Sequence, residues 1–169
     1  MAKTALCASL LCVSSYIVLP LPFTPIVLSL HTVMINIIGL MLKPKNAACT
    51  VGIYLLMGLI GLPVFSGGTA GPGKLFGPTG GFYFGFLLAV IAISILKGSE
   101  IKLSRYVAVT TLAGLPIQHI CAVLFMCFHN GFDVTAAVMT VSLPFLIGDV
   151  IKCVIASVIG AEINRTLGQ

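Results

Sequence analysis

The sequence contains very few charged residues, and this scarcity excludes most classes of soluble protein. Only 8% of its 169 residues are charged, nine Lys or Arg and four Asp or Glu, whereas soluble domains carry about 25%. Tryptophan is absent, 59% of the residues are hydrophobic, and the mean hydropathy is +1.17. So few charges cannot solvate a globular surface of this size. A soluble domain, a disordered chain and a coiled coil are excluded, which leaves an integral membrane protein.

The patterns that build catalytic or metal sites are also missing. The six cysteines form no CxxC pair, and the sequence contains no HExxH, GxSxG or GxxxxGK[ST] motif. The cysteines stand in apolar stretches, where we expect small buried side chains. We therefore predict that the chain is not an enzyme, holds no metal or cofactor, and has no ATP site of its own.

Proline, glycine and charged residues divide the apolar sequence into six segments, and one membrane span needs about 20 residues. The predicted spans lie at about 4–19, 26–42, 46–62, 79–96, 106–128 and 134–160. The start of the chain is as apolar as the residues after it, so we interpret it as the first span rather than a cleavable signal peptide. Together the spans predict one all-α membrane domain over residues 1–169.

Basic residues are distributed unequally between the two ends of these spans. Only Lys74 falls on the side opposite the termini, and Lys152 lies within the sixth span. The side with both termini carries Lys3, Lys43, Lys45, Lys97, Lys102, Arg105 and Arg165. Because basic loop residues stay in the cytoplasm, both termini are predicted to be cytoplasmic. The positive charge then reflects topology in a multi-pass protein of the cell membrane, and no nucleic-acid partner is expected.

A long Gly- and Pro-rich stretch, 63–78, separates the third and fourth predicted spans. Glycine allows the backbone to adopt positive φ and to approach a ligand closely. Phe65, Leu75 and Phe76 supply apolar anchors that a flexible linker would lack. We interpret the stretch as the lid or re-entrant wall of a binding site on the external side, with a flexible linker as the alternative.

Two charged residues lie within the sixth predicted span. Asp149 and Lys152 are three residues apart and share one helix face. An unpaired charge at this depth costs roughly 2.5–3.5 kcal/mol, so both must face protein, water or a ligand. Two interpretations stay open: an ion pair that locks helices together, or a site with Lys152 for an anionic group and Asp149 for an N–H donor. His31 and Tyr83 are weaker candidates for ligand contacts.

The first predicted span carries small residues four positions apart, Ala5 with Ser9 and Ala8 with Cys12. This spacing allows a second helix to approach closely. That helix belongs either to this chain or to a partner subunit. The segment 81–85, with glycine at both ends, is a second candidate for close approach and is expected to pack within the chain.

These features together resemble the biotin-specific S-components of energy-coupling factor (ECF) transporters, the BioY family. The resemblance is carried by PFTPIVLSLHT at 22–32, by GLPVFSGG at 61–68 with GPTGGFYFGF at 77–86, and by PFLIGDVIK at 144–152. It implies an S-component fold of six helices that captures biotin from outside and delivers it to the cytoplasm. The implied partners are a transmembrane coupling subunit and ATPase subunits.

The resemblance also implies where ligand and partner bind. Biotin would lie near the external face, under the first loop and the Gly-rich loop. The resemblance carries over Asp149 and Lys152 as ligand-site residues. Together with the candidates from the sequence itself, the expected ligand-binding residues are His31, Phe65, Gly67, Gly68, Lys74, Thr79, Tyr83, Asp149 and Lys152. The expected contacts to the coupling subunit are Ala5, Ala8, Ser9 and Cys12. The family usually has glutamine at position 31 and alanine at positions 9 and 12.

Other functions remain as alternatives. The chain could be an S-component for another vitamin, a biotin facilitator that needs no ATPase, a structural membrane subunit or a small membrane enzyme. The Gly-rich lid argues against a purely structural role. The absence of an acid–base pair or a metal motif argues against an enzyme.

Overall fold

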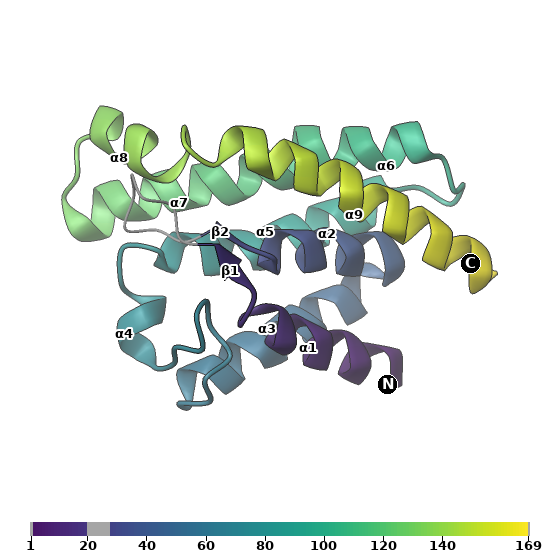
Figure 1. The fold of residues 1–169 in the computed structure, drawn as a ribbon, viewed down its shortest axis with the longest axis horizontal. Coiled ribbons are helices and arrows are strands. Elements are labelled where there is room, and N and C mark those ends of the chain that lie inside the picture. Colours follow the sequence, from purple (N-terminus) through teal and green to yellow (C-terminus); the bar gives the residue numbers. More distant parts are fainter. Residues whose placement is uncertain (1, 20–27, 169) are drawn as a thin grey trace.

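The computed structural model describes residues 2–19 and 28–168, which are mostly helical (Figure 1). The helices are α1 (Ala2–Ser14), α2 (His31–Met41), α3 (Pro44–Leu59), α4 (Pro72–Leu75), α5 (Gly80–Leu96), α6 (Leu103–Val109), the π-helical η1 (Thr110–Gly114), α7 (Leu115–Asn130), α8 (Val134–Val141) and α9 (Leu146–Thr166). Two short strands, β1 (Val18–Leu19) and β2 (Leu28–Ser29), pair antiparallel. Apart from this small pairing, the described chain is all-α as predicted.

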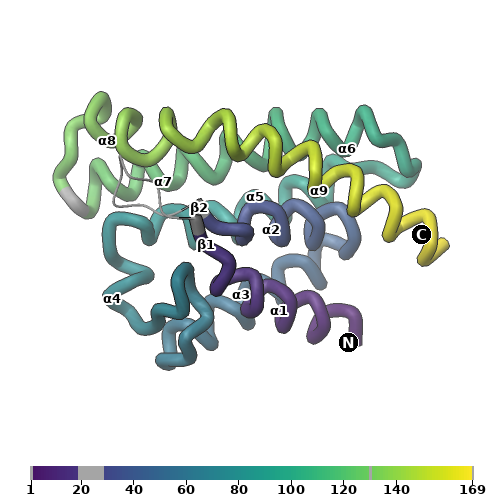
Figure 2. The backbone as a smooth tube through the Cα atoms, viewed as in Figure 1, coloured from purple at the N-terminus to yellow at the C-terminus, as the bar shows by residue number. Residues whose placement is uncertain are grey.

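Helices α2 and α5 form the middle of the bundle (Figure 2). On one side α9 packs along α2 and α7 packs along α5, while on the other side α3 packs against α5 and α1 packs against α3. The largest buried cluster lies between α1, α2, α3 and α5 and includes Leu11, Ile35, Tyr54 and Phe86. The two central helices therefore hold both outer layers in place.

The two chain ends lie at the same end of the bundle (Figure 1). The α2–α3 and α5–α6 connections lie at that end as well, whereas α4 and α8 lie at the opposite end. The segments that carry the seven basic residues of the predicted cytoplasmic side are thus gathered at one end. The count of six spans and the orientation in the membrane stay predictions.

The outer surface of the bundle is apolar. Phe128 is 86% exposed, Ile147 79% and Leu112 77%. Within the described residues, the continuous helix Leu103–His129 is long and apolar enough to cross a membrane, and α8 with α9 satisfies the same criteria as a bent pair. Large apolar side chains exposed in this number mark a surface that faces lipid or another protein.

The sixth predicted span, 134–160, is not one continuous helix. Helix α8 ends at Val141 and α9 begins at Leu146, with a bend of 51° between them. Pro144 lies in this break, where its missing N–H and its ring disfavour a continuous helix. The break places Asp149 in the first turn of α9.

Two other helices are shorter than predicted. Helix α1 ends at Ser14 rather than near residue 19, and the chain continues through a turn into β1. Helix α2 begins at His31 rather than near residue 26. The apolar patterning of both stretches is equally compatible with the short strands that pair here, so the sequence alone did not locate these helix ends.

The Gly-rich stretch packs against the bundle. Phe65 is fully buried in the main core cluster, and Val64 and Leu75 are buried in it too. This part of the stretch is therefore packed into the core, and the flexible-linker interpretation is wrong for it. The expectation of a buried apolar anchor is wrong for Phe76, which is 49% exposed and has its ring near the rings of Phe84 and His129.

Glycines at 81 and 85 bring α5 close to α7, as predicted for internal packing. A Cβ at Gly81 would lie 2.6 Å from the carbonyl oxygen of Cys121 and 2.7 Å from the Cα of Ala122. A Cβ at Gly85 would lie 3.0 Å from the Cα of Gln118. These neighbours are backbone atoms of α7, so they cannot move aside as a flexible side chain would.

We expect Gly81→Ala to destabilise the protein by about 1–3 kcal/mol, because it forces α5 away from α7. Gly52→Ala is the matched control, since no atom lies within 4 Å of its added Cβ and alanine favours a helix interior by up to about 1 kcal/mol. Thermal unfolding in detergent measures both variants. Equal melting temperatures for the two would contradict this account of the α5–α7 contact.

Candidate ligand-binding site

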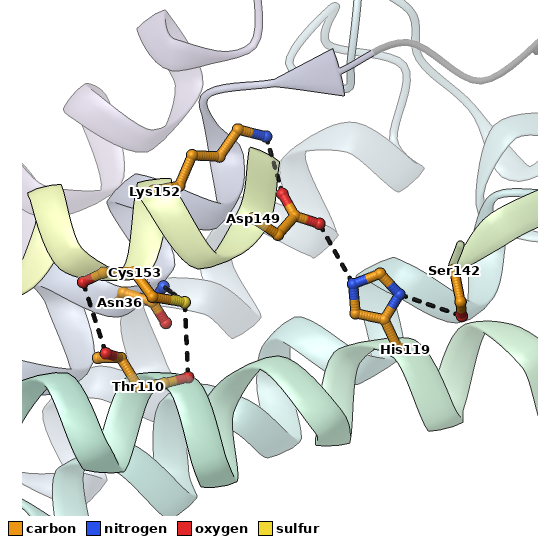
Figure 3. Close-up of polar contacts among 7 residues, drawn as sticks. All are labelled: Asn36, Thr110, His119, Ser142, Asp149, Lys152 and Cys153. Carbon is orange, nitrogen blue, oxygen red and sulfur yellow. Dashed lines mark hydrogen bonds and ion pairs between the residues drawn. The ribbon is translucent and has the colours of Figure 1, made fainter. Parts of the chain in front are cut away.

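The charged pair of α9 is buried between helices. Asp149 is only 6% exposed and Lys152 only 7%. Lys152 Nζ donates a hydrogen bond to Asp149 Oδ1 at 2.9 Å (Figure 3). The shared helix face predicted from the spacing is therefore observed. A carboxylate in the first turn of a helix is also stabilised by the positive end of the helix dipole.

A histidine completes this polar network. His119 Nε2 lies 3.2 Å from Asp149 Oδ2, and His119 Nδ1 lies 3.2 Å from Ser142 Oγ (Figure 3). Because an ionised carboxylate only accepts hydrogen bonds, Nε2 carries the proton in this contact. The network joins α9, α7 and the break between α8 and α9.

His31 joins the Gly-rich stretch to the bundle. Its Nε2 pairs with the hydroxyl of Tyr54 at 2.8 Å, and its Nδ1 lies 3.1 Å from Ser29 Oγ and 3.4 Å from Ser66 Oγ. The ring is fully buried and stacks on Phe86 with centroids 6.0 Å apart. Both ring nitrogens thus face protein groups, and direct contact of His31 with a ligand stays a prediction.

Phe65 and Tyr83 lie side by side, although they come from the loop and from α5. Their ring centroids are 4.6 Å apart, and Tyr83 OH accepts a hydrogen bond from the backbone N–H of Ser66 at 3.2 Å. Both side chains are buried. Two of the predicted ligand residues, Phe65 and Tyr83, are therefore in direct ring contact.

Gly67 and Gly68 form the turn of the loop. Their φ values are +74° and +69°, a region that residues with a Cβ rarely adopt. Gly67 N–H donates to the carbonyl of Ser15 at 2.9 Å, and Gly68 lies against the ring of Tyr16. The glycines are needed for the turn itself, which attaches the loop to the chain just after α1.

Lys74 and Thr79 lie elsewhere in the same segment. Lys74 is in α4, where partial burial lowers the pKa of its ammonium group, and no described residue accepts a hydrogen bond from its Nζ. Thr79 precedes α5 and accepts a hydrogen bond from the N–H of Phe82. No described hydrogen bond or ion pair joins Lys74 or Thr79 to Asp149 or Lys152. Their ligand roles stay predictions.

Several buried polar groups have no clear signal in the sequence. His119 and Ser142 enter the network only because distant helices meet, and their isolated positions in apolar segments were the one available signal. Six buried side-chain polar atoms have no hydrogen-bond partner among the described residues: Ser15 Oγ, Thr32 Oγ1, Asn36 Oδ1, Thr111 Oγ1, Gln118 Nε2 and Asn164 Oδ1. Buried polar groups are normally hydrogen-bonded, so such atoms are candidates for water or ligand contacts.

A second buried polar cluster lies further along α9 (Figure 3). Asn36 Nδ2 donates to Cys153 Sγ at 3.4 Å, and Thr110 Oγ1 lies 3.0 Å from Ser157 Oγ. This cluster ties α2 and the π-helical turn η1 to α9. It contains no charged group, so its contribution is to hold helices together.

One cavity lined by described residues lies away from the charged pair. It measures about 520 Å³ and opens on the outer surface of α5 and α7. Its lining consists of Gly81, Phe84, Cys121, Leu124, Phe125, Phe128 and His129. None of these is a predicted ligand residue. The first loop, 20–27, which was predicted to cover the ligand, lies outside the described residues.

The small residues of α1 divide into two pairs. Ala5 and Ser9 are exposed, and Ser9 Oγ bonds back to the carbonyl of Ala5 at 3.0 Å. Ala8 is buried against the chain and Cys12 is half-buried. Only the first pair is open to another subunit in this structure. Among residues 2–19 and 28–168, no group of His, Cys, Asp or Glu could hold a metal ion.

The fold is that of a transporter S-component. It matches a solved structure described as the S-component for biotin from an ECF-type ABC transporter, with a TM-score of 0.84 and 23% identity. The match covers 97% of this chain and 89% of the other.

The chain belongs to the BioY family, whose model matches residues 1–169. It is 31% identical to the biotin transporter BioY2 of Lactococcus lactis, over 98% of this chain and 90% of that protein. It is also 31% identical to the biotin transporter BioY of Thermotoga maritima, over 96% and 94%. The resemblance noted in the sequence is therefore confirmed, and the protein is a transporter component rather than an enzyme.

We expect Tyr54→Phe to destabilise the fold by about 1–3 kcal/mol, because it leaves His31 Nε2 buried without a partner. Tyr16→Phe is the matched control: the Tyr16 hydroxyl donates a hydrogen bond to the carbonyl of Pro63 at 2.8 Å, but the residue is 60% exposed. Thermal unfolding in detergent should separate the two variants. A similar loss of thermal stability in both variants would show that the buried Tyr54–His31 hydrogen bond stabilises the fold no more than the exposed Tyr16 one.

Proposed function

We propose that this chain is the membrane-embedded substrate-binding subunit of an ECF-type transporter and that it captures biotin from outside the cell. The observation that carries the proposal is a buried Asp149–Lys152 pair in a chain of the BioY family. The relatives named as biotin transporters align along almost the whole chain. Biotin uptake is therefore the function that family and geometry favour together.

The chemistry of biotin suits this pair. Biotin has a small apolar bicycle, a ureido group with two N–H donors and one carbonyl oxygen, and a carboxylate tail. Lys152 would complement the carboxylate, and Asp149 would accept hydrogen bonds from the ureido group. A few well-placed polar groups in an apolar site suffice to orient a small ligand. In the structure the two charges neutralise each other, and on binding each would exchange this partner for one on the ligand.

The Gly-rich stretch would act as the lid. Its turn is held by Tyr83 and His31 through Ser66, and by Ser15 through Gly67. These are single hydrogen bonds between neutral groups, each worth only about 0.5–1.5 kcal/mol, so the turn can open at modest cost. Capture from outside, closure of the lid and release on the cytoplasmic side complete the proposed cycle.

Energy would come from partner subunits. The sequence has no nucleotide-binding motif, so separate ATPase subunits and a transmembrane coupling subunit would drive release. The exposed Ala5–Ser9 surface of α1 offers a close approach for a partner helix. We further propose a six-span topology in the cell membrane with both termini in the cytoplasm, which the clustering of basic segments at one end of the bundle supports.

Calorimetry with the purified chain in detergent tests the proposal. Biotin should bind tightly with a stoichiometry of one, and riboflavin and thiamine should give no binding heat. Binding of riboflavin or thiamine in place of biotin would show that the substrate is another vitamin. No biotin binding by a folded sample would overturn the proposed function.

A further inference from the structure

His119 contacts the proposed site without being one of the predicted ligand residues. It lies on α7, is almost fully buried, and packs edge-on against the ring of Phe82 with centroids 5.7 Å apart. Its two ring nitrogens reach two different elements, Asp149 in α9 and Ser142 in the α8–α9 break. The ring therefore spans the gap between the break and the first turn of α9 (Figure 3).

The two oxygens of Asp149 have different partners. Oδ1 accepts from Lys152 on the same helix, and Oδ2 pairs with His119 on α7. A carboxylate held at one oxygen by a group from another helix keeps a fixed plane, which is how supporting residues orient a binding group. His119 thus determines the direction in which Oδ1 points.

The contact becomes more important when the ion pair opens. If Lys152 turns to an anionic ligand, His119 is the described side chain that still holds Asp149. A buried carboxylate without any partner is strongly disfavoured. Because of the His119 contact, Asp149 keeps a hydrogen-bond partner when Lys152 moves away from it.

Ser142 fixes the ring from the other side. Since Nε2 donates to Asp149, Nδ1 of a neutral imidazole is the acceptor, and the Ser142 hydroxyl donates to it. Ser142 also accepts backbone hydrogen bonds from Phe145 and Leu146, so it is part of the turn that ends α8 and starts α9. The orientation of the imidazole is thereby tied to the break in the last helix.

We propose that His119 is a positioning residue, which holds Asp149 Oδ2 so that Oδ1 and Lys152 are oriented towards the ligand. This role rests on the proposed function, because the ligand concerned is biotin. His119 acts through Asp149 and is not itself assigned a contact with biotin.

Two isosteric substitutions separate positioning from general packing. The side-chain amide of glutamine reaches about as far as Nε2, whereas that of asparagine reaches only about as far as Nδ1. We expect His119→Gln to bind biotin within about threefold of wild type. His119→Asn, which keeps only the Ser142 side of the contact, should bind at least about tenfold more weakly, the effect of losing a hydrogen bond to a charged group.

Calorimetry gives the biotin affinities, and thermal unfolding is measured on the same samples. His129→Asn is the matched control on α7, because His129 is exposed and contacts only Phe76 and Phe125 among the described rings. Its affinity should equal that of wild type. Different affinities for His119→Gln and His119→Asn at similar melting temperatures support positioning.

Two results overturn the proposal. If wild type binds biotin and both His119 variants bind equally well, or lose affinity only in parallel with their melting temperatures, His119 has no positioning role while the proposed function stands. If wild type binds no biotin, the proposed function fails first and the positioning role fails with it.

Discussion

The arrangement of the last helix depends on the need to satisfy a charged pair inside an apolar bundle. Asp149 and Lys152 neutralise each other, but the carboxylate has a second oxygen that water cannot easily reach. His119 supplies its partner, and this brings α7 against the first turn of α9. The break at Pro144 makes the contact possible, because it starts a new helix whose first turn carries the carboxylate. Helix break, buried pair and histidine therefore form one unit.

The Gly-rich stretch, which we propose as the lid, is packed closely against the bundle. Phe65 anchors it in the core, while the positive φ values of Gly67 and Gly68 turn the backbone back towards α1. The polar contacts of the turn are few and uncharged, with His31 joining it to the second and third helices. Strong apolar anchoring beside weak polar contacts is what the proposed lid role requires.

Much of this could be predicted from the sequence, because membrane proteins obey strong local rules. The scarcity of charge, the spacing of Asp149 and Lys152, and the apolar anchors Phe65 and Leu75 indicated the class of protein, the charged pair and the packing of the Gly-rich stretch against the bundle. Pro144 indicated that the sixth segment could be loosened but not that it is divided into two helices, since proline can also bend a continuous membrane helix. His119 was not assigned to the site because its role depends on a contact between residues thirty positions apart. The short strands β1 and β2 were also missed, because their apolar residues fit a helix end as well as a strand.

The buried pair is proposed to bind the ligand and not only to hold the helices together. The most direct test combines Asp149→Asn with Lys152→Met, which removes both charges together and so leaves no unpaired ion. Glu100→Gln with Lys102→Met is the control, because that pair, 2.6 Å apart, is exposed. Calorimetry with biotin should show a folded double variant that has lost binding and a control that retains it. Undiminished biotin binding by the Asp149–Lys152 double variant would contradict the account.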